Sequence, residues 1–132
     1  MPAPSDVPAG ALRVGTAEEM AGAVTRSHLA DGRCVGWFGD PDVVIDAELA
    51  DQTVPPALAA RYGTHDFWRR WTAAECRAKR ADVPIATWLR RHGLGGGGSR
   101  VDVRTCHLQD VVVSVLGGVV TLADERVDAG RS

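Results

Sequence analysis

Hydrophobic residues between positions 67 and 81 recur at helical spacing. Apolar side chains return at steps of four and three, which places them along one face of an amphipathic helix. Proline cannot continue a helix, so Pro84 places the end of this one near Ala81 or Asp82. The residues of the apolar stripe are Phe67, Trp71, Ala74, Ala78 and Ala81.

Two short helices are expected on either side of this long one, over residues 56–61 and 85–92. The first opens at consecutive prolines, which suit the first turn of a helix. Each segment is followed by a glycine, Gly63 or Gly93, of the kind that ends helices. Asp82 is expected to cap the second helix.

A further helix is expected near the N-terminus. Thr16 and Glu19 have the spacing of a capping box, in which each side chain satisfies a free backbone N–H of the other residue. Met20 and Val24 supply an apolar edge. The pattern predicts a helix over about residues 17–26.

The remaining apolar runs predict strands. Residues 32–38 and 43–49 are separated by a turn over residues 39–42, so we expect them to pair as a hairpin. The C-terminal third has the pattern of a β-meander. Its expected strands span residues 101–106, 111–116 and 119–122, with turns at Gln109-Asp110 and Gly117-Gly118.

This order of elements, with one helix, two strands, further helices and a meander, predicts an α+β fold. Residues 1–10 are rich in Pro, Ala and Gly, and we expect them to form a loose tail. Residues 11–132 are then one domain of ordinary size.

Composition and charge narrow the classes of function. The chain has 132 residues, of which 45% are hydrophobic and 24% charged, as is typical of a globular protein. The net charge of -2 argues against a general nucleic-acid binder. No apolar run approaches the roughly 18 residues of a membrane span, and the first residues lack the pattern of a secretory signal. Three cysteines without a CxxC pair argue against a disulfide framework or zinc site, so we expect a reducing, cytoplasmic location.

Two carboxylates share one face of the strand expected after residue 42. Asp46 and Glu48 are two positions apart, so their side chains leave the strand on the same side. Val43, Ile45 and Ala47 alternate with them and are expected to face the core. Neighbouring carboxylates resist joint ionisation unless a cation lies between them, and oxygen ligands of this kind suit Mg²⁺. The alternative is an ordinary solvated strand face.

Glu75 and Lys79 are one turn apart on the long helix. Residues at this spacing are neighbours, and one interpretation is a surface ion pair worth about 0.3–0.5 kcal/mol. The other is a carboxylate that completes a metal site and an ammonium that holds a phosphate. Lys79 is the only lysine among 15 basic residues, and an ammonium is not interchangeable with a guanidinium.

A Ser-His pair, Ser27-His28, precedes the first expected strand. The pair invites a hydrolase interpretation, but the sequence has no GxSxG elbow and assigns no third member of a triad. The alternative role of His28 is to bind the last carbonyl groups of the helix expected before it.

Taken in order, these motifs resemble the 4′-phosphopantetheinyl transferase superfamily. Members of its longer branch carry a Ser-His, a Gly-rich strand, an Asp-x-Glu on the next strand, and a helix with Trp-Ser/Thr-x-Lys-Glu-x-x-x-Lys. The resemblance covers about residues 25–117, with Ala74 in place of the first lysine of the helix motif. The matching segments are Ser27-His28, Gly32 to Gly36, Asp46-Ala47-Glu48 and Trp71 to Lys79.

The family transfers the phosphopantetheine arm of coenzyme A to a serine of an acyl or peptidyl carrier protein. The resemblance implies that Mg²⁺ is held by Asp46, Glu48 and Glu75 together with the coenzyme A pyrophosphate. It also implies that Glu75 takes the serine proton, directly or through water. The implied contacts to phosphate groups come from Ser27 and His28 at the nucleotide and from Lys79 at the pyrophosphate.

The resemblance further implies a single lobe of this family, with helices packed on an antiparallel β-meander. The longer branch has two similar lobes, and the short branch assembles as trimers, so a homo-oligomer or a partner lobe is expected. Two other hypotheses stay open from the sequence. One is a catalytically degenerate relative that binds a carrier protein or coenzyme A, and the other is an unrelated α+β interaction protein.

Overall fold

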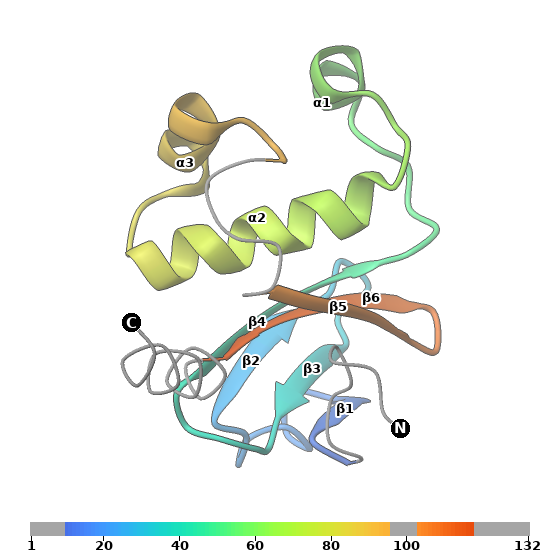
Figure 1. Cartoon of the computed structure of the whole chain (residues 1–132). Coiled ribbons are helices and arrows are strands. Elements are labelled where there is room, and N and C mark those ends of the chain that lie inside the picture. Colours follow the sequence, from blue (N-terminus) through green and yellow to red (C-terminus); the bar gives the residue numbers. More distant parts are fainter. Residues whose placement is uncertain (1–9, 96–102, 118–132) are drawn as a thin grey trace, which may run out of the picture.

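The computed structural model describes residues 10–95 and 103–117 (Figure 1). The described residues form two three-stranded antiparallel sheets and three helices, which confirms the α+β class. One sheet has the order β1-β3-β2, with β1 (Leu12–Gly15), β2 (Thr25–His28) and β3 (Cys34–Trp37). The other has the order β4-β6-β5, with β4 (Val43–Leu49), β5 (Val103–Leu108) and β6 (Val111–Gly117). The helices are α1 (Pro56–Tyr62), α2 (Phe67–Ala81) and α3 (Ile85–His92).

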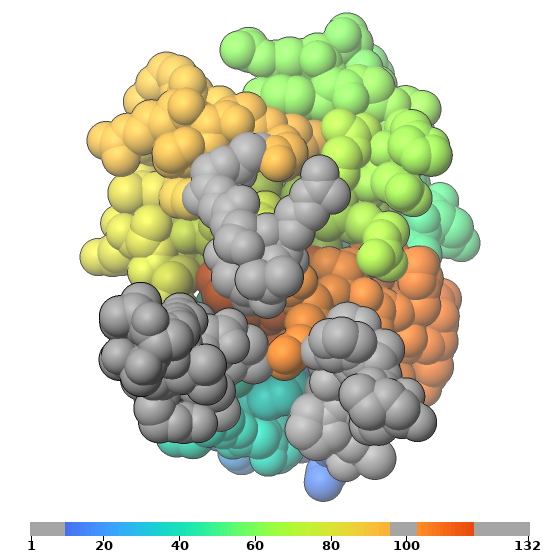
Figure 2. Space-filling model, viewed as in Figure 1, coloured from blue at the N-terminus to red at the C-terminus, as the bar shows by residue number. Residues whose placement is uncertain are grey.

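These elements stack in layers, with the β1-β3-β2 sheet below the β4-β6-β5 sheet and the helices above it (Figure 1). The space-filling view shows the same order, with the green and yellow helices over the orange and cyan strands (Figure 2). The helix α2 lies on the β4-β6-β5 sheet and contacts all three of its strands. α3 packs on α2 in turn.

The main apolar core lies between the two sheets. Each buried Val, Leu or Ile side chain stabilises the fold by about 1.5–3 kcal/mol relative to exposure. β4 presents alternate residues to this core, as the sequence predicts, so its other face is turned toward α2. The core residues are Ala11, Leu29, Val35, Trp37, Val43, Ile45, Ala47, Val111, Val113 and Val115.

A buried chain of hydroxyl groups fixes α2 on the sheet. The Thr72 and Ser114 hydroxyls lie 2.7 Å apart, and Ser114 and Thr105 also lie 2.7 Å apart. The Cys76 thiol donates to the Ser114 carbonyl at 3.2 Å. Since buried polar groups are costly unless paired, these contacts specify which side of α2 meets the sheet. Residues of α2 next to these contacts therefore face β4, and they include Glu75 and Lys79.

Several local predictions are confirmed. α2 ends at Ala81, and Asp82 closes it in a left-handed conformation with φ 61°. α1 and α3 lie where the prolines and glycines indicate, and the turn between β5 and β6 falls at Gln109-Asp110. The predicted cap of α3 is wrong, because Pro84 is its N-cap and Asp82 ends α2 instead.

The helix expected over residues 17–26 is wrong. The capping box itself forms, since the Thr16 amide donates to Glu19 Oε1 at 2.8 Å and the Glu19 amide donates to Thr16 Oγ1 at 3.0 Å. The chain makes only a short turn and then enters β2, where it pairs with β3. Gly22 and the β-branched Val24 disfavour a longer helix, and the pairing partner decides the outcome.

The expected hairpin between residues 32–38 and 43–49 is also wrong. β3 lies between β1 and β2, whereas β4 pairs with β6 over its whole length. β6 is buried from Val111 to Leu116, so it takes the centre of the second sheet and needs a partner on each side. The short strand β1 was not expected from the sequence.

Other predictions fall outside the described residues, namely the tail before Gly10, the strand over 119–122 and the Gly118 half of the Gly117-Gly118 turn. Cys34, Cys76 and Cys106 are all free thiols in the structure. None of the helices in the described ranges is long and apolar enough to cross a membrane.

Candidate functional site

The two carboxylates of β4 and the Glu-Lys pair of α2 meet at one edge of the second sheet. β4 is an edge strand, and the face that carries Asp46 and Glu48 is the one that α2 covers. Lys79 Nζ donates to Asp46 Oδ1 at 3.2 Å and to the carbonyl oxygen of Ile45 at 2.9 Å. The structure therefore joins Asp46 and Lys79, which are 33 residues apart, in one ion pair.

We refer to Asp46, Glu48 and Glu75 as the acid cluster. Asp46 is only 7% exposed, and burial, opposed by Lys79, raises its pKa to about 7. The charges of Glu75 and Glu48 raise the pKa of Asp46 further. Burial also raises the pKa of Glu48 and of Glu75, and these two carboxylates repel each other. A solvated strand face is therefore the wrong interpretation for Asp46.

One oxygen of Asp46 has no partner within the part of the chain that the structure describes. Oδ2 is buried and accepts no hydrogen bond from any described residue. Leaving a buried acceptor unsatisfied costs about 1–3 kcal/mol, and more for a charged group. Three carboxylates around a single ammonium also leave an excess of negative charge. Both features are typical of a site that accepts a cation.

The acid cluster suits the Mg²⁺ that the resemblance implies only as a hydrated ion. Within residues 10–95 and 103–117, no group of three or more His, Cys, Asp or Glu side chains is arranged to hold a metal ion directly. Mg²⁺ keeps several waters and commonly uses only one or two carboxylates together with phosphate oxygens. The buried, unpartnered oxygen of Asp46 and the neighbouring Glu48 and Glu75 fit a hydrated Mg²⁺ of this kind.

Ser27 lies at the free edge of β4, beside the acid cluster. Its Oγ accepts a 3.0 Å hydrogen bond from the Ala47 amide, which lies between Asp46 and Glu48 in the chain. Ser27 is buried, whereas His28 is exposed. Successive side chains of a strand point to opposite faces, so this Ser-His pair does not form the nucleophile and base of a hydrolase. The helix-end role of His28 is wrong too, because His28 belongs to β2.

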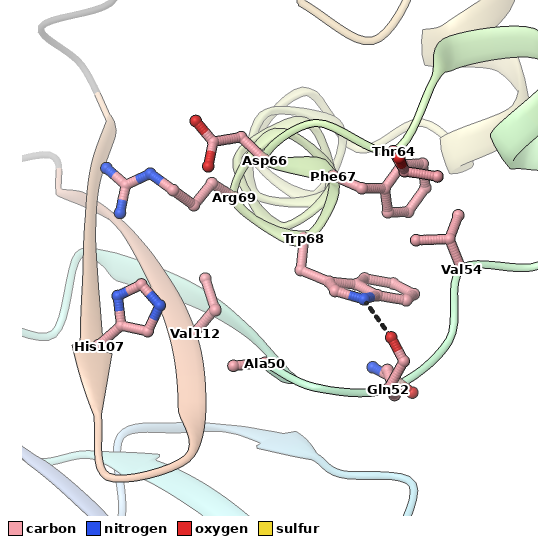
Figure 3. Close-up of a pocket in the computed structure, with 10 residues that line it drawn as sticks. All are labelled: Ala50, Gln52, Val54, Thr64, Asp66, Phe67, Trp68, Arg69, His107 and Val112. Carbon is pink, nitrogen blue, oxygen red and sulfur yellow. Dashed lines mark hydrogen bonds between the residues drawn. The ribbon is translucent and has the colours of Figure 1, made fainter.

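Gln52 connects the acid cluster to a pocket at the start of α2 (Figure 3). Its Nε2 donates to Glu48 Oε1 at 2.7 Å, and its backbone carbonyl accepts from Trp68 Nε1 at 3.0 Å. The pocket has a volume of about 260 Å³. Figure 3 shows Arg69 and His107 at one end of it and Trp68 between them and Gln52.

Sequence reasoning missed Gln52, Arg69 and His107. Gln52 follows the end of β4, where the alternation of strand residues no longer applies. Arg69 and His107 come from α2 and β5, and no spacing rule relates two elements so far apart in the chain. Only the i, i+2 pair on β4 and the i, i+4 pair on α2 had a local signal.

Ala74, which replaces a lysine of the family motif, faces away from the acid cluster. It is 1% exposed and belongs to a second apolar core between α2 and α3. Trp88 and Leu94 are buried in the same core. A small side chain is therefore what the packing of α3 requires at this position.

Comparison with known proteins gave no match to a family model, a curated protein or a solved structure. The resemblance to phosphopantetheinyl transferases therefore stays a hypothesis that is carried by the motifs and by the grouping of Asp46, Glu48, Glu75 and Lys79.

Proposed function

We propose that the chain is a compact phosphopantetheinyl transferase, which moves the 4′-phosphopantetheine arm of coenzyme A to a serine of an acyl or peptidyl carrier protein with Mg²⁺. One observation carries the proposal. The carboxylates of Asp46, Glu48 and Glu75 converge from two elements beside Lys79, and a buried oxygen of Asp46 has no partner among the described residues. This set combines oxygen ligands for a hard cation with a positive charge for a phosphate.

Asp46, Glu48 and Glu75 are the residues that would hold Mg²⁺. When bound, the ion would neutralise the negative charge on the phosphate oxygens. Lys79 adds an ammonium whose side chain is 40% exposed and can reach a pyrophosphate from the solvent side. Phosphoryl transfer depends mostly on such positioning and charge stabilisation.

Glu75 is the proposed base. Its carboxylate is half-buried on α2 beside Lys79, where it can accept a proton at the site. The serine oxygen attacks the phosphorus that carries the pantetheine arm, and its proton passes to Glu75 directly or through water. The bond from this phosphorus to the bridging oxygen breaks, and 3′,5′-adenosine diphosphate leaves with that oxygen.

His28 is the better candidate of the Ser-His pair for a contact with the nucleotide phosphates. Its side chain is exposed on β2, beside the edge of β4. Ser27 is buried and already accepts from Ala47, so we assign it mainly to holding β2 against β4. We propose that a second copy of the chain, as in a trimer, or a partner lobe supplies the opposite wall of the site.

Intact-mass measurement of an apo carrier protein tests the transfer. Incubation with coenzyme A and Mg²⁺ is expected to add one phosphopantetheine to the carrier, and Glu75→Gln is expected to lower the rate at least about 100-fold. Glu18→Gln, at an exposed turn, is the matched control and keeps the rate. Absence of any mass gain across a panel of acyl and peptidyl carriers overturns the proposal. Size-exclusion chromatography tests the assembly, which is not expected to be a monomer.

A catalytically degenerate relative is the second candidate, and position 74 favours it. The phosphate contact of the family's first lysine is lost, because Ala74 is buried under α3. This candidate predicts Mg²⁺-dependent binding of coenzyme A without transfer, or binding of a carrier protein alone. Titration calorimetry separates it from an unrelated α+β interaction protein, which binds neither.

A further inference from the structure

We propose that Lys79 and a divalent cation compete for Asp46, so that cation binding releases the Lys79 ammonium toward solvent. This exchange of Lys79 for the cation rests on the metal site proposed above. Beyond that site, we infer that Lys79 competes with the cation and that release of Lys79 couples cation binding to the binding of a diphosphate.

The contacts of Lys79 place its ammonium among oxygens that also suit a divalent cation. Nζ is 3.2 Å from Asp46 Oδ1 and 2.9 Å from the carbonyl oxygen of Ile45. Carboxylate and backbone carbonyl oxygens are both ligands of hard cations. An ammonium and a cation therefore seek the same oxygens, and binding of either one weakens binding of the other.

The charges around Lys79 favour replacement by an ion of higher charge. The ammonium offsets one carboxylate, but Asp46, Glu48 and Glu75 all lie within its electrostatic reach. Asp46 Oδ2 is buried and receives no hydrogen bond from Lys79 or from any other described residue. A divalent cation brings twice the charge and can satisfy this second oxygen directly or through its waters.

The cost of releasing Lys79 is small. Its side chain is 40% exposed, whereas that of Asp46 is 10% exposed. A lysine stem is long and flexible, and its charged end can move into water while the methylene groups stay against the protein. Asp46, fixed on the edge strand β4, has no comparable freedom.

Release of Lys79 has a consequence for anion binding. A bound cation repels the ammonium, so Lys79 points away from Asp46 toward the side from which a phosphate arrives. A diphosphate can then contact both positive groups at once. Cation and diphosphate therefore bind with positive coupling, and each raises the affinity of the other by the same factor.

Calorimetric titration of the full chain with MgCl₂ tests the competition. Lys79→Gln removes the competitor and is expected to bind Mg²⁺ about five- to tenfold more tightly than the unaltered protein. With saturating coenzyme A, the unaltered protein is expected to gain affinity for Mg²⁺, and Lys79→Gln to gain less. Arg61→Gln, on α1, is the control for the loss of one positive charge and leaves both affinities unchanged.

Since Lys79 is the only lysine of the chain, selective ¹³C labelling at lysine Cε gives one side-chain NMR signal. Added MgCl₂ is expected to move this signal toward the position of a solvated lysine. Asp46→Asn is expected to place it there without Mg²⁺. Lys79→Met also removes the ammonium and keeps a long apolar stem, so it provides a second variant if Lys79→Gln fails to fold.

The outcomes separate the two proposals. The exchange is overturned if Lys79→Gln binds Mg²⁺ no more tightly than the unaltered protein. It is also overturned if Mg²⁺ binds without moving the NMR signal of Lys79. In both cases the metal site itself stands. If Lys79→Gln binds Mg²⁺ and the unaltered protein does not, the exchange is supported, because the ammonium then excludes the cation completely. If neither protein binds Mg²⁺, with or without coenzyme A, the exchange and the proposed metal-dependent function both fail.

Discussion

The amide of Ala47 donates a 3.0 Å hydrogen bond to the hydroxyl of Ser27 and thereby joins the two sheets. Ala47 lies on β4, at the free edge of the second sheet, and Ser27 lies on β2, at the edge of the first. An edge strand presents unpaired backbone groups, and on β4 the Ala47 amide is one that a side chain takes. Lys79 binds the Ile45 carbonyl in the same way.

Ser27→Ala is expected to destabilise the fold by about 1–3 kcal/mol, because it leaves the buried amide of Ala47 without an acceptor. Urea unfolding measures the change. The neighbouring His28→Ala, on the exposed side of β2, is expected to stay within about 0.5 kcal/mol of the unaltered protein. Equal stability losses in the two variants would show that the hydroxyl of Ser27 has no special role.

Stability is expected to fall as the pH rises from about 4 to 7. Burial raises the pKa of Asp46 from 3.8 to about 7, so the folded state binds a proton that the unfolded state has already released. The stabilising proton is present below pH 3.8 and is lost by about pH 7. Above pH 7, Asp46 contributes no further change. Glu48 and Glu75 act in the same direction, since burial raises the pKa of each.

Asp46→Asn isolates this contribution, because the amide has the same shape and does not ionise. The variant is expected to be more stable than the unaltered protein at pH 8, by roughly 2–4 kcal/mol, and equally stable near pH 4. Denaturant unfolding at several pH values gives both curves. Asp51→Asn, at the exposed turn after β4, is the control and preserves the pH profile. A variant whose stability falls with pH as steeply as that of the unaltered protein would contradict the assignment to Asp46.

Gly36 on β3 is expected to tolerate no larger residue. A Cβ at this position would lie 2.8 Å from Met20 Sδ and 3.0 Å from Ala23 Cβ. The methionine can move, but the alanine carbon cannot move without its backbone. Gly36→Ala should therefore cost about 1–3 kcal/mol in urea unfolding. Gly22→Ala meets no atom within 4 Å and is the control, so a similar loss there would argue against a steric cause.

Local sequence rules predict only those parts of the fold that residues close together in the chain determine. The spacing of apolar residues defines α2, and alternation places Asp46 and Glu48 on one face of β4. Thr16 shows the limit of such rules, because its capping box forms but the following residues pair with β3 instead of extending a helix. Strand partners depend on the whole chain, so neither β2 nor the pairing of β4 with β6 had a local signal.

The same limit applies to the candidate site. The sequence contains one carboxylate pair on a strand and one Glu-Lys pair on a helix, but their meeting depends on how α2 packs on β4. The hydroxyl contact between Thr72 and Ser114 sets that packing. It joins residues 42 positions apart in the chain, which no spacing rule relates. The order of the motifs, compared with a known family, was the only signal in the sequence that grouped the two pairs.

Replacement of Ala74 by lysine tests whether this position serves the packing of α3 or the binding of substrate. Ala74 is 1% exposed between α2 and α3, so Ala74→Lys would bury an ammonium and is expected to destabilise the fold by more than about 2 kcal/mol. The new lysine would face the second core and not the acid cluster, so no gain in coenzyme A affinity is expected. Ala81→Lys, at the exposed end of α2, is the matched control and should change stability by less than about 0.5 kcal/mol. Thermal unfolding and calorimetry with coenzyme A measure the two effects. A stable Ala74→Lys variant with tighter coenzyme A binding would mean that this side of α2 opens to the substrate, and that α3 is displaced when coenzyme A binds.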